Sequence, residues 1–259
     1  MIDITHLLDL AKRAALLAGE AILKVYGSED FGVEMKNDKS PLTLADKAAH
    51  TIIVSHLEST GLPILSEEGS SVKYDDRKNW DYFWLIDPLD GTKEFIKRSG
   101  EFTVNIALMR SSTPVAGVIY APYINILYYG SKETGVYKIE NQKEVPLTQM
   151  ENKRTMEHLL QKEQVTVVAS KSHMNEETST FIKQFHNANF SSMGSSLKLM
   201  LLAEGAADIY PRIAPTMEWD TAAGDAILRS LNMGVYQTDL KNKLLYNKEN
   251  LLNPSFIAL

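Results

Sequence analysis

The amino-acid sequence predicts an α+β fold built from layered helices and strands, and three observations support this class. A long helical pattern begins the chain. Strand-like apolar runs separated by turn residues follow it, and their spacing predicts an antiparallel meander. The last third of the chain mixes short helical and strand-like patterns. The chain shows no internal repeat and no low-complexity tract.

The size of the chain limits its domain organisation. It has 259 residues, of which 44% are hydrophobic and 23% charged, an ordinary balance for a globular protein. This length fits one large unit or two tightly joined subdomains. The stretch Asn141–Gln164 is charged and weakly patterned, which makes it the candidate boundary. We therefore predict an N-terminal α+β subdomain at 1–150 and a C-terminal α/β subdomain at 151–259, tightly joined as one unit.

Charge and cysteine content exclude several functions. The formal net charge of −6 leaves no surplus of Lys and Arg for non-specific nucleic-acid binding, although basic residues or metal ions can still attract an anionic substrate locally. The absence of cysteine excludes disulfides, thiolate nucleophiles, zinc ribbons and cysteine-ligated iron–sulfur clusters. The N-terminus has no basic segment followed by an apolar run, and no stretch approaches the roughly 18 apolar residues of a membrane span. We expect a cytoplasmic protein without an integral membrane segment.

The N-terminal elements follow from apolar periodicity and turn residues. Apolar residues at steps of three and four predict a helix over Thr5–Tyr26. A second helix is predicted from Thr43 to about Ser59, where Gly61 and Pro63 stop it. Short extended segments are expected at Phe31–Met35 and Ile64–Leu65. Polar composition predicts loops at Lys36–Pro41 and Ser70–Asn79.

The remaining elements form the meander and the C-terminal part. Tyr82–Ile86 is aromatic, branched and uncharged, and therefore predicts a buried strand. The further strands of the meander are predicted at Phe102–Met109, Val115–Ala121, Ile126–Tyr129 and Thr134–Glu140. Later strands are predicted at Val165–Ala169 and Ala207–Pro211, and helices at Asn175–Phe185, Ser195–Glu204 and Thr221–Leu231.

The strongest chemical signal is the segment Asp87–Thr92, which follows the buried strand. Asp87 and Asp90 are two carboxylates three residues apart, and Pro88 and Gly91 bend the chain. Hard cations such as Mg²⁺ prefer such oxygen ligands, and the turn can aim both carboxylates and the Leu89 carbonyl at one point. If Thr92 begins a helix, its free N–H groups face a phosphate. The alternative is that Asp90 and Gly91 form a hairpin turn, which does not need two acids separated by proline.

Two further acidic motifs can join the same site. Glu67 follows the apolar Ile64–Leu65, where a carboxylate can reach the metal; the alternative is a solvated acidic loop. Asp220 precedes a helix whose small residues Ala222–Gly224 allow close packing, but aspartate is also a favoured N-cap. Asp225 is the weaker candidate, because it can simply face solvent.

Two other segments have ordinary structural explanations beside their functional ones. Thr43–Asp46 has the spacing of a capping box, and its acid can also orient a threonine hydroxyl or a metal-bound water. Gly194–Ser196 precedes a helix and can bind an anion or a hydroxyl, or can be a plain helix start. The histidines lack a metal-ligand spacing, and neither the Gly-x-Ser-x-Gly motif nor the P-loop is present.

Together these motifs resemble the inositol-monophosphatase superfamily. Its hallmarks are Glu-Glu after a short strand, then Asp-Pro-Leu-Asp-Gly-Thr, then Trp-Asp-x-x-Ala-Gly, and all three are present in this order. Further segments are similar to the bacterial CysQ branch, the 3′(2′),5′-bisphosphate nucleotidases: Ser40–Asp46, Asp90–Ile96, Gly100–Asn105, Gly194–Lys198 and Tyr210–Arg212. Inositol monophosphatases more often have Thr-Asn-Phe where this chain has Lys93–Phe95. The similarity covers most of the chain and is weakest across Asn141–Gln164.

The resemblance implies an α-β-α-β-α layered sandwich and a Mg²⁺-dependent phosphomonoesterase. It assigns two or three Mg²⁺ ions to four carboxylates and one backbone carbonyl: Glu67, Asp87, Leu89, Asp90 and Asp220. It implies a catalytic role for Glu67 and for Asp46 and Thr92, which would help activate the attacking water. The backbone N–H groups of Gly91 and Thr92 would bind the phosphate. The implied substrate contacts are Glu67, Leu89, Asp90, Gly91, Thr92, Asp220, Gly194, Ser195 and Arg212.

The substrate that the resemblance implies is adenosine 3′,5′-bisphosphate, a small metabolite of sulfur metabolism that would lose its 3′-phosphate to give AMP. Lys93, Lys198 and Arg212 are candidates for binding the second phosphate or the ribose, although a lysine is more commonly a solvated surface charge. The alternatives are an inositol monophosphatase and a non-catalytic regulatory scaffold of the same fold, against which the intact set of acids argues. We expect no nucleic-acid partner, a monomer or homodimer, and a cytoplasmic location, with family members described at the cytoplasmic face of the inner membrane.

Overall fold

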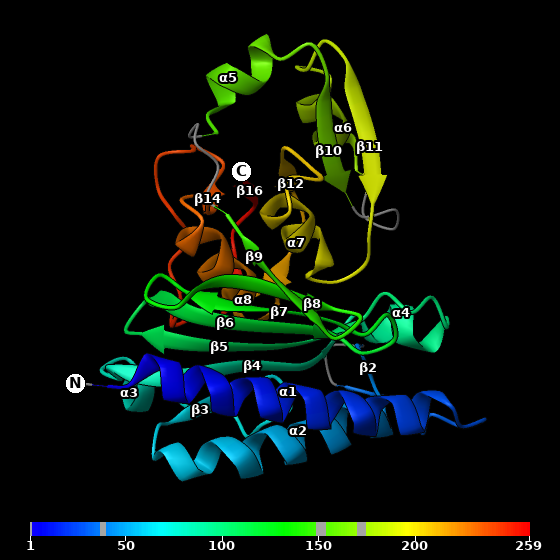
Figure 1. Ribbon diagram of the computed structural model, residues 1–259, viewed down its shortest axis with the longest axis vertical. Coiled ribbons are helices and arrows are strands. Elements are labelled where there is room, and N and C mark those ends of the chain that lie inside the picture. Colours follow the sequence, from blue (N-terminus) through cyan, green and yellow to red (C-terminus); the bar gives the residue numbers. More distant parts are fainter. Residues whose placement is uncertain (1, 37–39, 149–153, 170–174) are drawn as a thin grey trace.

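The fold is seen in a computed structural model that describes residues 2–36, 40–148, 154–169 and 175–259. Helices and sheets alternate in stacked layers (Figure 1): α1 and α2, a large sheet, α7 and α8, a smaller sheet, and α5 with α6. This arrangement confirms the predicted layered α-β-α-β-α fold. The helices are α1 (Ile4–Tyr26), α2 (Leu44–Leu57), η1 (Glu58–Thr60), α3 (Tyr74–Arg77), α4 (Thr92–Ile96), α5 (Met156–Gln161), α6 (Glu176–Ile182), α7 (Leu197–Ala203) and α8 (Glu218–Ser230).

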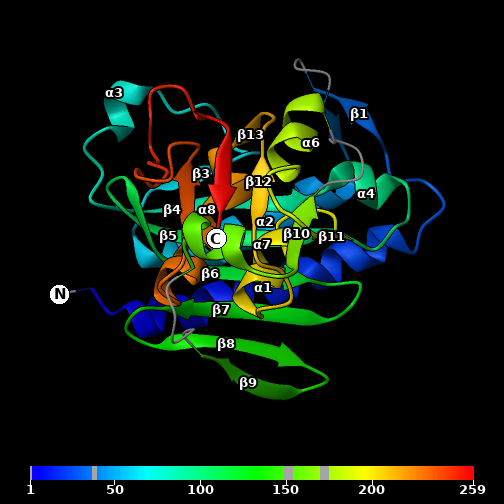
Figure 2. The same cartoon turned by 90° about the horizontal axis from the view of Figure 1, so that it is seen from above.

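The large sheet is the predicted meander with one parallel strand added at its edge. Its order is β3-β4-β5-β6-β7-β8-β9; β3 pairs parallel with β4, and all later neighbours are antiparallel. Figure 2 shows these strands side by side from above. The strands are β3 (Ile64–Ser66), β4 (Tyr82–Asp90), β5 (Thr103–Arg110), β6 (Thr113–Ala121), β7 (Ile126–Ser131), β8 (Gly135–Glu140) and β9 (Lys143–Leu147).

The smaller sheet is assembled from short strands of the C-terminal part. β10 pairs parallel with β11, β16 lies antiparallel between β12 and β14, and an isolated bridge between Val167 and Ile209 links the two groups. Two more antiparallel pairs, β1 with β2 and β13 with β15, lie outside these sheets. The strands are β1 (Glu34–Met35), β2 (Pro41–Leu42), β10 (Val165–Ala169), β11 (Ala188–Ser192), β12 (Tyr210–Arg212), β13 (Thr216–Met217), β14 (Val235–Gln237), β15 (Leu252–Asn253) and β16 (Phe256–Ala258).

Both faces of the large sheet are buried. Successive side chains of a strand point to opposite faces, so Trp84 and Ile86 of β4 pack against α1 and α2, whereas Phe83 and Leu85 face α7 and α8. This double burial explains why Tyr82–Ile86 is a continuous apolar run rather than an alternating one.

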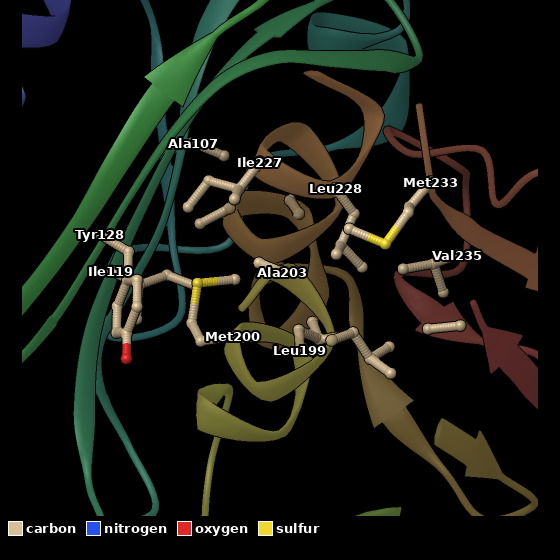
Figure 3. Close-up of a cluster of buried hydrophobic side chains, with 14 of the residues drawn as sticks. Ala107, Ile119, Tyr128, Leu199, Met200, Ala203, Ile227, Leu228, Met233 and Val235 are labelled. Carbon is tan, nitrogen blue, oxygen red and sulfur yellow. The ribbon is translucent and has the colours of Figure 1, made fainter. Parts of the chain in front are cut away.

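Helix α8 lies very close to the sheet and to α7 (Figure 3), as its small residues predicted. A Cβ added at Gly117 of β6 would lie 2.2 Å from the Ala223 carbonyl oxygen, and one added at Gly224 would lie 2.4 Å from Leu199 Cδ1. In the close-up, Ile227 and Leu228 of α8, Leu199 and Met200 of α7, and residues of the sheet fill the space between these elements. The small residues therefore allow α8 to lie close to β6 and α7.

Several predicted elements differ from the structure. Ser70–Asn79 is not only a surface loop, because it contains α3, whose Arg77 is buried and donates to Asn247 Oδ1 (2.7 Å). The strand predicted at Phe31–Met35 is reduced to Glu34–Met35. The weakly patterned Asn141–Gln164 contains β9 and α5. Residues 37–39 of the predicted Lys36–Pro41 loop and residues 149–153 of the predicted boundary lie outside the described residues.

One apolar cluster includes residues from both predicted subdomains, such as Phe83 and Met109 on one side and Met200 and Ile227 on the other. The division at residue 150 stays a prediction. In the part of the chain that the structure describes, no helix is long and apolar enough to cross a membrane.

Candidate active site

The end of β4 carries the two aspartates of the Asp87–Thr92 motif. The pairing of β4 with β5 is irregular between Asp87 and Asp90. The Leu89 N–H donates to Asp87 Oδ1 (3.0 Å), which fixes this bend. Gly91 then has φ +90°, a left-handed conformation that favours glycine, and is the N-cap of α4. The hairpin alternative is wrong, because α4 lies in the connection between Gly91 and β5.

The acids that the sequence predicted to converge do lie near one another. Burial raises the pKa of Asp87 well above its usual value, and the charges of Glu67, Asp90 and Asp220 raise it further. Burial and the Asp90 charge likewise raise the pKa of Asp220. Burial raises the pKa of Asp90 to about 6, although Lys198, Ser196 and Asn105 lower it; Glu67 adds a smaller contribution that raises it. The carboxylates therefore lie close enough together for their charges to interact.

Glu67 is the acid at the edge of this group. Its N–H donates to the Ile86 carbonyl (3.1 Å), which places it beside the end of β4. Its carboxylate accepts a hydrogen bond from Lys36 Nζ (2.7 Å), and Lys36 also pairs with Glu68. Burial disfavours the Lys36 charge, but the two glutamates outweigh this effect and raise its pKa. The ammonium group of Lys36 therefore lies beside Glu67, one of the carboxylates of the predicted metal site.

Asp46 and Thr92 form the pair that the resemblance implied. Asp46 lies in the first turn of α2 and is 2% exposed. Its Oδ2 accepts from the N–H (2.7 Å) and hydroxyl (2.6 Å) of Thr43, the predicted capping box. Thr92 Oγ1 lies 3.2 Å from Asp46 Oδ1 and 3.2 Å from the Leu89 carbonyl oxygen. The acid thus caps a helix and also orients a threonine, and burial raises its pKa.

Asp220 lies inside α8 rather than before it. The helix begins at Glu218, and Asp220 Oδ2 accepts from the Met217 N–H (2.9 Å) as the N3 acid of the first turn. The N-cap explanation of this residue is therefore wrong by three positions. Asp225 does not face solvent, since it is fully buried and accepts from Arg229 Nε, the Val235 N–H and the Tyr246 hydroxyl.

A buried polar network ties Asp90 to the start of α7. Asp90 Oδ2 accepts from the Ser196 N–H (2.6 Å) and from Asn105 Nδ2 (3.4 Å). Thr103 Oγ1 lies within hydrogen-bond distance of the Ser195 and Ser196 hydroxyls and of Asn105 Oδ1. These contacts join the acidic turn of the large sheet to the predicted Gly194–Ser196 anion site.

An open cavity lies beside these groups. Of the predicted substrate residues, six line it: Asp90, Gly91, Gly194, Ser195, Arg212 and Asp220. Among the described residues, the lining does not include Glu67, Leu89, Thr92 or the candidate Lys93, whose side chain is exposed.

Two cations of the C-terminal part face this cavity. Lys198 Nζ donates to the Ser195 carbonyl (2.6 Å) and the Met193 carbonyl (3.2 Å), and burial lowers its pKa to about 8, with Arg212 contributing in the same direction. Arg212 Nη2 donates to the Pro215 carbonyl (3.3 Å), while its buried Nε has no partner among the described residues. The cavity is therefore lined by the acids Asp90 and Asp220, which we call its acidic side, and by the cations Lys198 and Arg212, which we call its basic side. The two sets lie near each other, since the Lys198 charge lowers the pKa of Asp90.

The donor chemistry of the acidic side fits Mg²⁺. Carboxylates buried together repel one another, and divalent cations relieve that repulsion. Within the described residues, no three histidine, cysteine, aspartate or glutamate side chains are arranged to hold one ion. Mg²⁺ does not need such a set, because it usually takes one or two carboxylates and fills its octahedron with water, carbonyl and phosphate oxygens. The acids and the Leu89 carbonyl are therefore suitable oxygen donors for Mg²⁺.

Sequence reasoning gave no role in the site to three residues of this neighbourhood, Lys36, Thr103 and Asn105, although the last two lie in the CysQ-like segment Gly100–Asn105. Thr103 and Asn105 alternate with apolar residues on a strand that is otherwise a buried run, and a polar residue in such a run is a signal that could have identified them. Lys36 lies in a charged segment and carries no such signal.

Comparison with known proteins agrees with this geometry. The sequence matches the Inositol monophosphatase family over residues 3–257. It is similar to a protein of Salmonella typhimurium named 3′(2′),5′-bisphosphate nucleotidase CysQ, with 40% identity over 259 residues that cover 96% of this chain and 98% of the relative.

Solved structures give the same result. The crystal structure of CysQ from Bacteroides thetaiotaomicron, described as a bacterial member of the inositol monophosphatase family, is 47% identical, with a TM-score of 0.82 over 97% of this chain and 96% of that one. The inositol monophosphatase of Anabaena (Nostoc) shares the fold, with a TM-score of 0.74 at 24% identity over 99% of this chain and 91% of that one.

Proposed function

The chain belongs to the inositol monophosphatase family, and from this premise we propose that it is a Mg²⁺-dependent 3′(2′),5′-bisphosphate nucleotidase that converts adenosine 3′,5′-bisphosphate to AMP and phosphate. One observation carries the proposal beyond the family: a single cavity is lined both by Asp90, Gly91 and Asp220 and by the cations Lys198 and Arg212. Such a cavity suits a substrate with two phosphates, one for each side.

The acidic side is the proposed reaction centre. Two or three Mg²⁺ ions would be held by Glu67, Asp87, Asp90, Asp220 and the Leu89 carbonyl. When bound, these ions would act as Lewis acids that lower the pKa of water and offset phosphoryl charge. The backbone N–H groups of Gly91 and Thr92, at the start of α4, would orient the phosphoryl oxygens.

Asp46 and Thr92 are the proposed groups that handle the proton of the attacking water. Thr92 Oγ1 lies between Asp46 Oδ1 and the Leu89 carbonyl, at 3.2 Å from each. As the water oxygen bonds to phosphorus and the bond from phosphorus to the 3′ oxygen breaks, one water proton would pass by way of Thr92 Oγ1 to Asp46 Oδ1. The leaving 3′ oxygen would take up a proton from solvent water, which completes the 3′ hydroxyl of AMP. Burial raises the pKa of Asp46, which makes its carboxylate a better base.

The basic side is proposed to bind the 5′-phosphate. Burial and the Arg212 charge disfavour the charged form of Lys198, and a bound phosphate would relieve this. Arg212 Nε, buried and without a partner among the described residues, is an available donor. Inositol monophosphate has a single phosphate and would leave one side unused, so we propose a preference for the bisphosphate.

We further propose that the enzyme acts in the cytoplasm as a monomer or homodimer. Peripheral contact with the inner membrane stays a prediction of the resemblance.

Phosphate release with Mg²⁺ tests the proposed function. Adenosine 3′,5′-bisphosphate should be hydrolysed with a higher kcat/KM than inositol 1-phosphate, and Arg212→Ala should reduce that ratio. Arg110→Ala, which removes an exposed arginine of β5 outside this cavity, is the matched control. Equal or better turnover of inositol 1-phosphate would identify the inositol monophosphatase alternative, and failure to hydrolyse any phosphomonoester would favour the scaffold.

A further inference from the structure

We propose that Thr103 and Asn105 are positioning residues. Their hydrogen bonds hold the cavity wall, Gly194–Ser196, against the Asp90 carboxylate. This inference rests on the proposed function and deepens it, because it couples substrate binding to metal binding. Both residues lie on β5, and their side chains are 0% and 1% exposed. Neither is among the described residues that line the cavity, so both would act through others.

The hydrogen bonds fix the orientation of the Asn105 amide. Asn105 Oδ1 accepts from the Thr103 hydroxyl (3.0 Å) and from the Ser196 hydroxyl (2.8 Å). Because both donors lie on the oxygen side, the Nδ2 group faces Asp90 Oδ2, at 3.4 Å. The amide therefore connects the hydroxyls of the wall with the carboxylate.

Thr103 holds the wall itself. Its Oγ1 lies 2.9 Å from Ser195 Oγ and 2.8 Å from Ser196 Oγ. Ser195 has φ +44°, a left-handed conformation that is unfavourable for a residue with a Cβ. Such a conformation persists when surrounding contacts determine it, and the bond to Thr103 is one of them. Without the Thr103 hydroxyl, Ser195 is free to relax toward a negative φ.

Movement of the cavity wall Gly194–Ser196 would change the position of the Asp90 carboxylate. The Ser196 N–H donates to Asp90 Oδ2 at 2.6 Å, and a Cβ added at Gly91 would lie 3.3 Å from Ser195 Cβ. The same short segment thus touches the turn that begins α4, orients Asp90 and lines the cavity. Loss of the Thr103 hydroxyl should therefore weaken both nucleotide binding and metal binding.

The test is Thr103→Val, which removes the hydroxyl and keeps the shape. We expect the KM for adenosine 3′,5′-bisphosphate to rise about tenfold, the loss of roughly one buried hydrogen bond. The Kd of Mg²⁺, measured by titration calorimetry without substrate, should rise several-fold. Thr103→Ser should restore both values.

The matched control is Ser131→Ala. Ser131 is a buried hydroxyl of the same sheet whose Oγ contacts Thr134 Oγ1 (3.0 Å), and it does not line the cavity. This variant should lower the Tm as much as Thr103→Val does without moving KM or the Kd of Mg²⁺. A purely structural role for Thr103 would make the two variants behave alike, and that result would overturn the proposal.

A double-mutant cycle with Ser195→Ala provides a second readout. Because both changes delete the same contact, the KM of the double variant should match that of Thr103→Val, and additive effects would contradict the coupling. If Thr103→Val does not fold, Ser195→Ala alone should still weaken Mg²⁺ binding, and an unchanged Kd would refute the proposal. If the wild type hydrolyses no bisphosphate, the proposed function fails, whereas the calorimetric measurements still decide the positioning role.

Discussion

Replacing Asp90 by asparagine should stabilise the metal-free protein and abolish its activity. Burial disfavours the charged form of this side chain, and Glu67 adds repulsion; together these outweigh the favourable effects of Lys198, Ser196 and Asn105, so the Asp90 charge opposes folding unless a metal cation offsets it. The asparagine oxygen can still accept the N–H of Ser196, which donates to Asp90 Oδ2 at 2.6 Å. The substitution therefore removes the charge without removing the main hydrogen bond.

The magnitude follows from the pKa of Asp90. Burial raises it to about 6 from the ordinary 3.8. At about 1.4 kcal/mol for each tenfold change, the charged form disfavours folding by about 3 kcal/mol. An amide accepts a hydrogen bond less strongly than a carboxylate, which offsets about 1 kcal/mol. The net gain of about 2 kcal/mol corresponds to a rise in Tm of about 4–8 °C for a chain of this size.

The effect should depend on pH with a definite sign. Because the folded-state pKa of Asp90 is raised, the folded protein binds this proton more tightly than the unfolded chain does. The folded protein is therefore stabilised at low pH, and this contribution is lost as the pH rises from about 4 through about 6. Because asparagine does not ionise, the Asp90→Asn variant should not lose this stability as the pH rises. It should therefore be more stable than the wild type above pH 6.

Urea unfolding in EDTA between pH 4.5 and 8 measures this difference, and phosphate release with Mg²⁺ measures activity, which should fall at least about a hundredfold. Asp208→Asn is the matched control. Asp208 is a buried aspartate paired with Lys162 (2.7 Å) away from the cavity, and its replacement should destabilise the protein. An Asp90→Asn variant that is less stable than the wild type at pH 8 in EDTA would refute the electrostatic reasoning.

Four further predictions follow from the structure. Thr92→Val should lower kcat by about a hundredfold with little change in KM, because it removes the hydroxyl next to Asp46; steady-state kinetics would show this, and an unchanged kcat would exclude the proton path. Burial lowers the pKa of Lys198 to about 8, so the KM for the bisphosphate should rise as the pH increases through 8, and a pH profile of Lys198→Met should lack this rise. Gly117→Ala should lower the free energy of unfolding by about 1–3 kcal/mol, since its Cβ would lie 2.2 Å from a carbonyl oxygen; chemical denaturation would measure this, and a neutral effect would contradict the packing. EDTA should abolish phosphate release and added Mg²⁺ should restore it, whereas full turnover by the metal-stripped protein would rule out the proposed mechanism.

Much of the fold was predictable because its signals are local. The capping box at Thr43 and Asp46 marked the start of α2, and the aromatic run Tyr82–Ile86 marked β4. Elements without such signals were missed. The strand β11 has three polar residues among its five and no buried residue, and α3 is a single turn. Their formation depends on neighbours that a local pattern does not contain.

The sequence indicated which residues belong to the candidate site, but not how their side chains are arranged in space. Asp225 and Arg229 have the spacing of an ordinary exposed ion pair on a helix. In the structure Asp225 also accepts a hydrogen bond from the Tyr246 hydroxyl, and the pair is largely buried. The hydrogen bonds of Asp90 come from β5 and from the start of α7, which only the tertiary fold brings together. For the same reason the sequence could not show that Lys36 pairs with Glu67.

The most direct test of the account is a crystal of the protein soaked in Mn²⁺ as a heavier substitute for Mg²⁺. Anomalous difference density should show at least two ions whose nearest ligands are carboxylate oxygens of Asp87, Asp90 and Asp220, at about 2.1 Å. Density that is absent from this cluster, or that is found only on exposed acids elsewhere, would contradict the claim that these carboxylates gather to hold metal beside a phosphate.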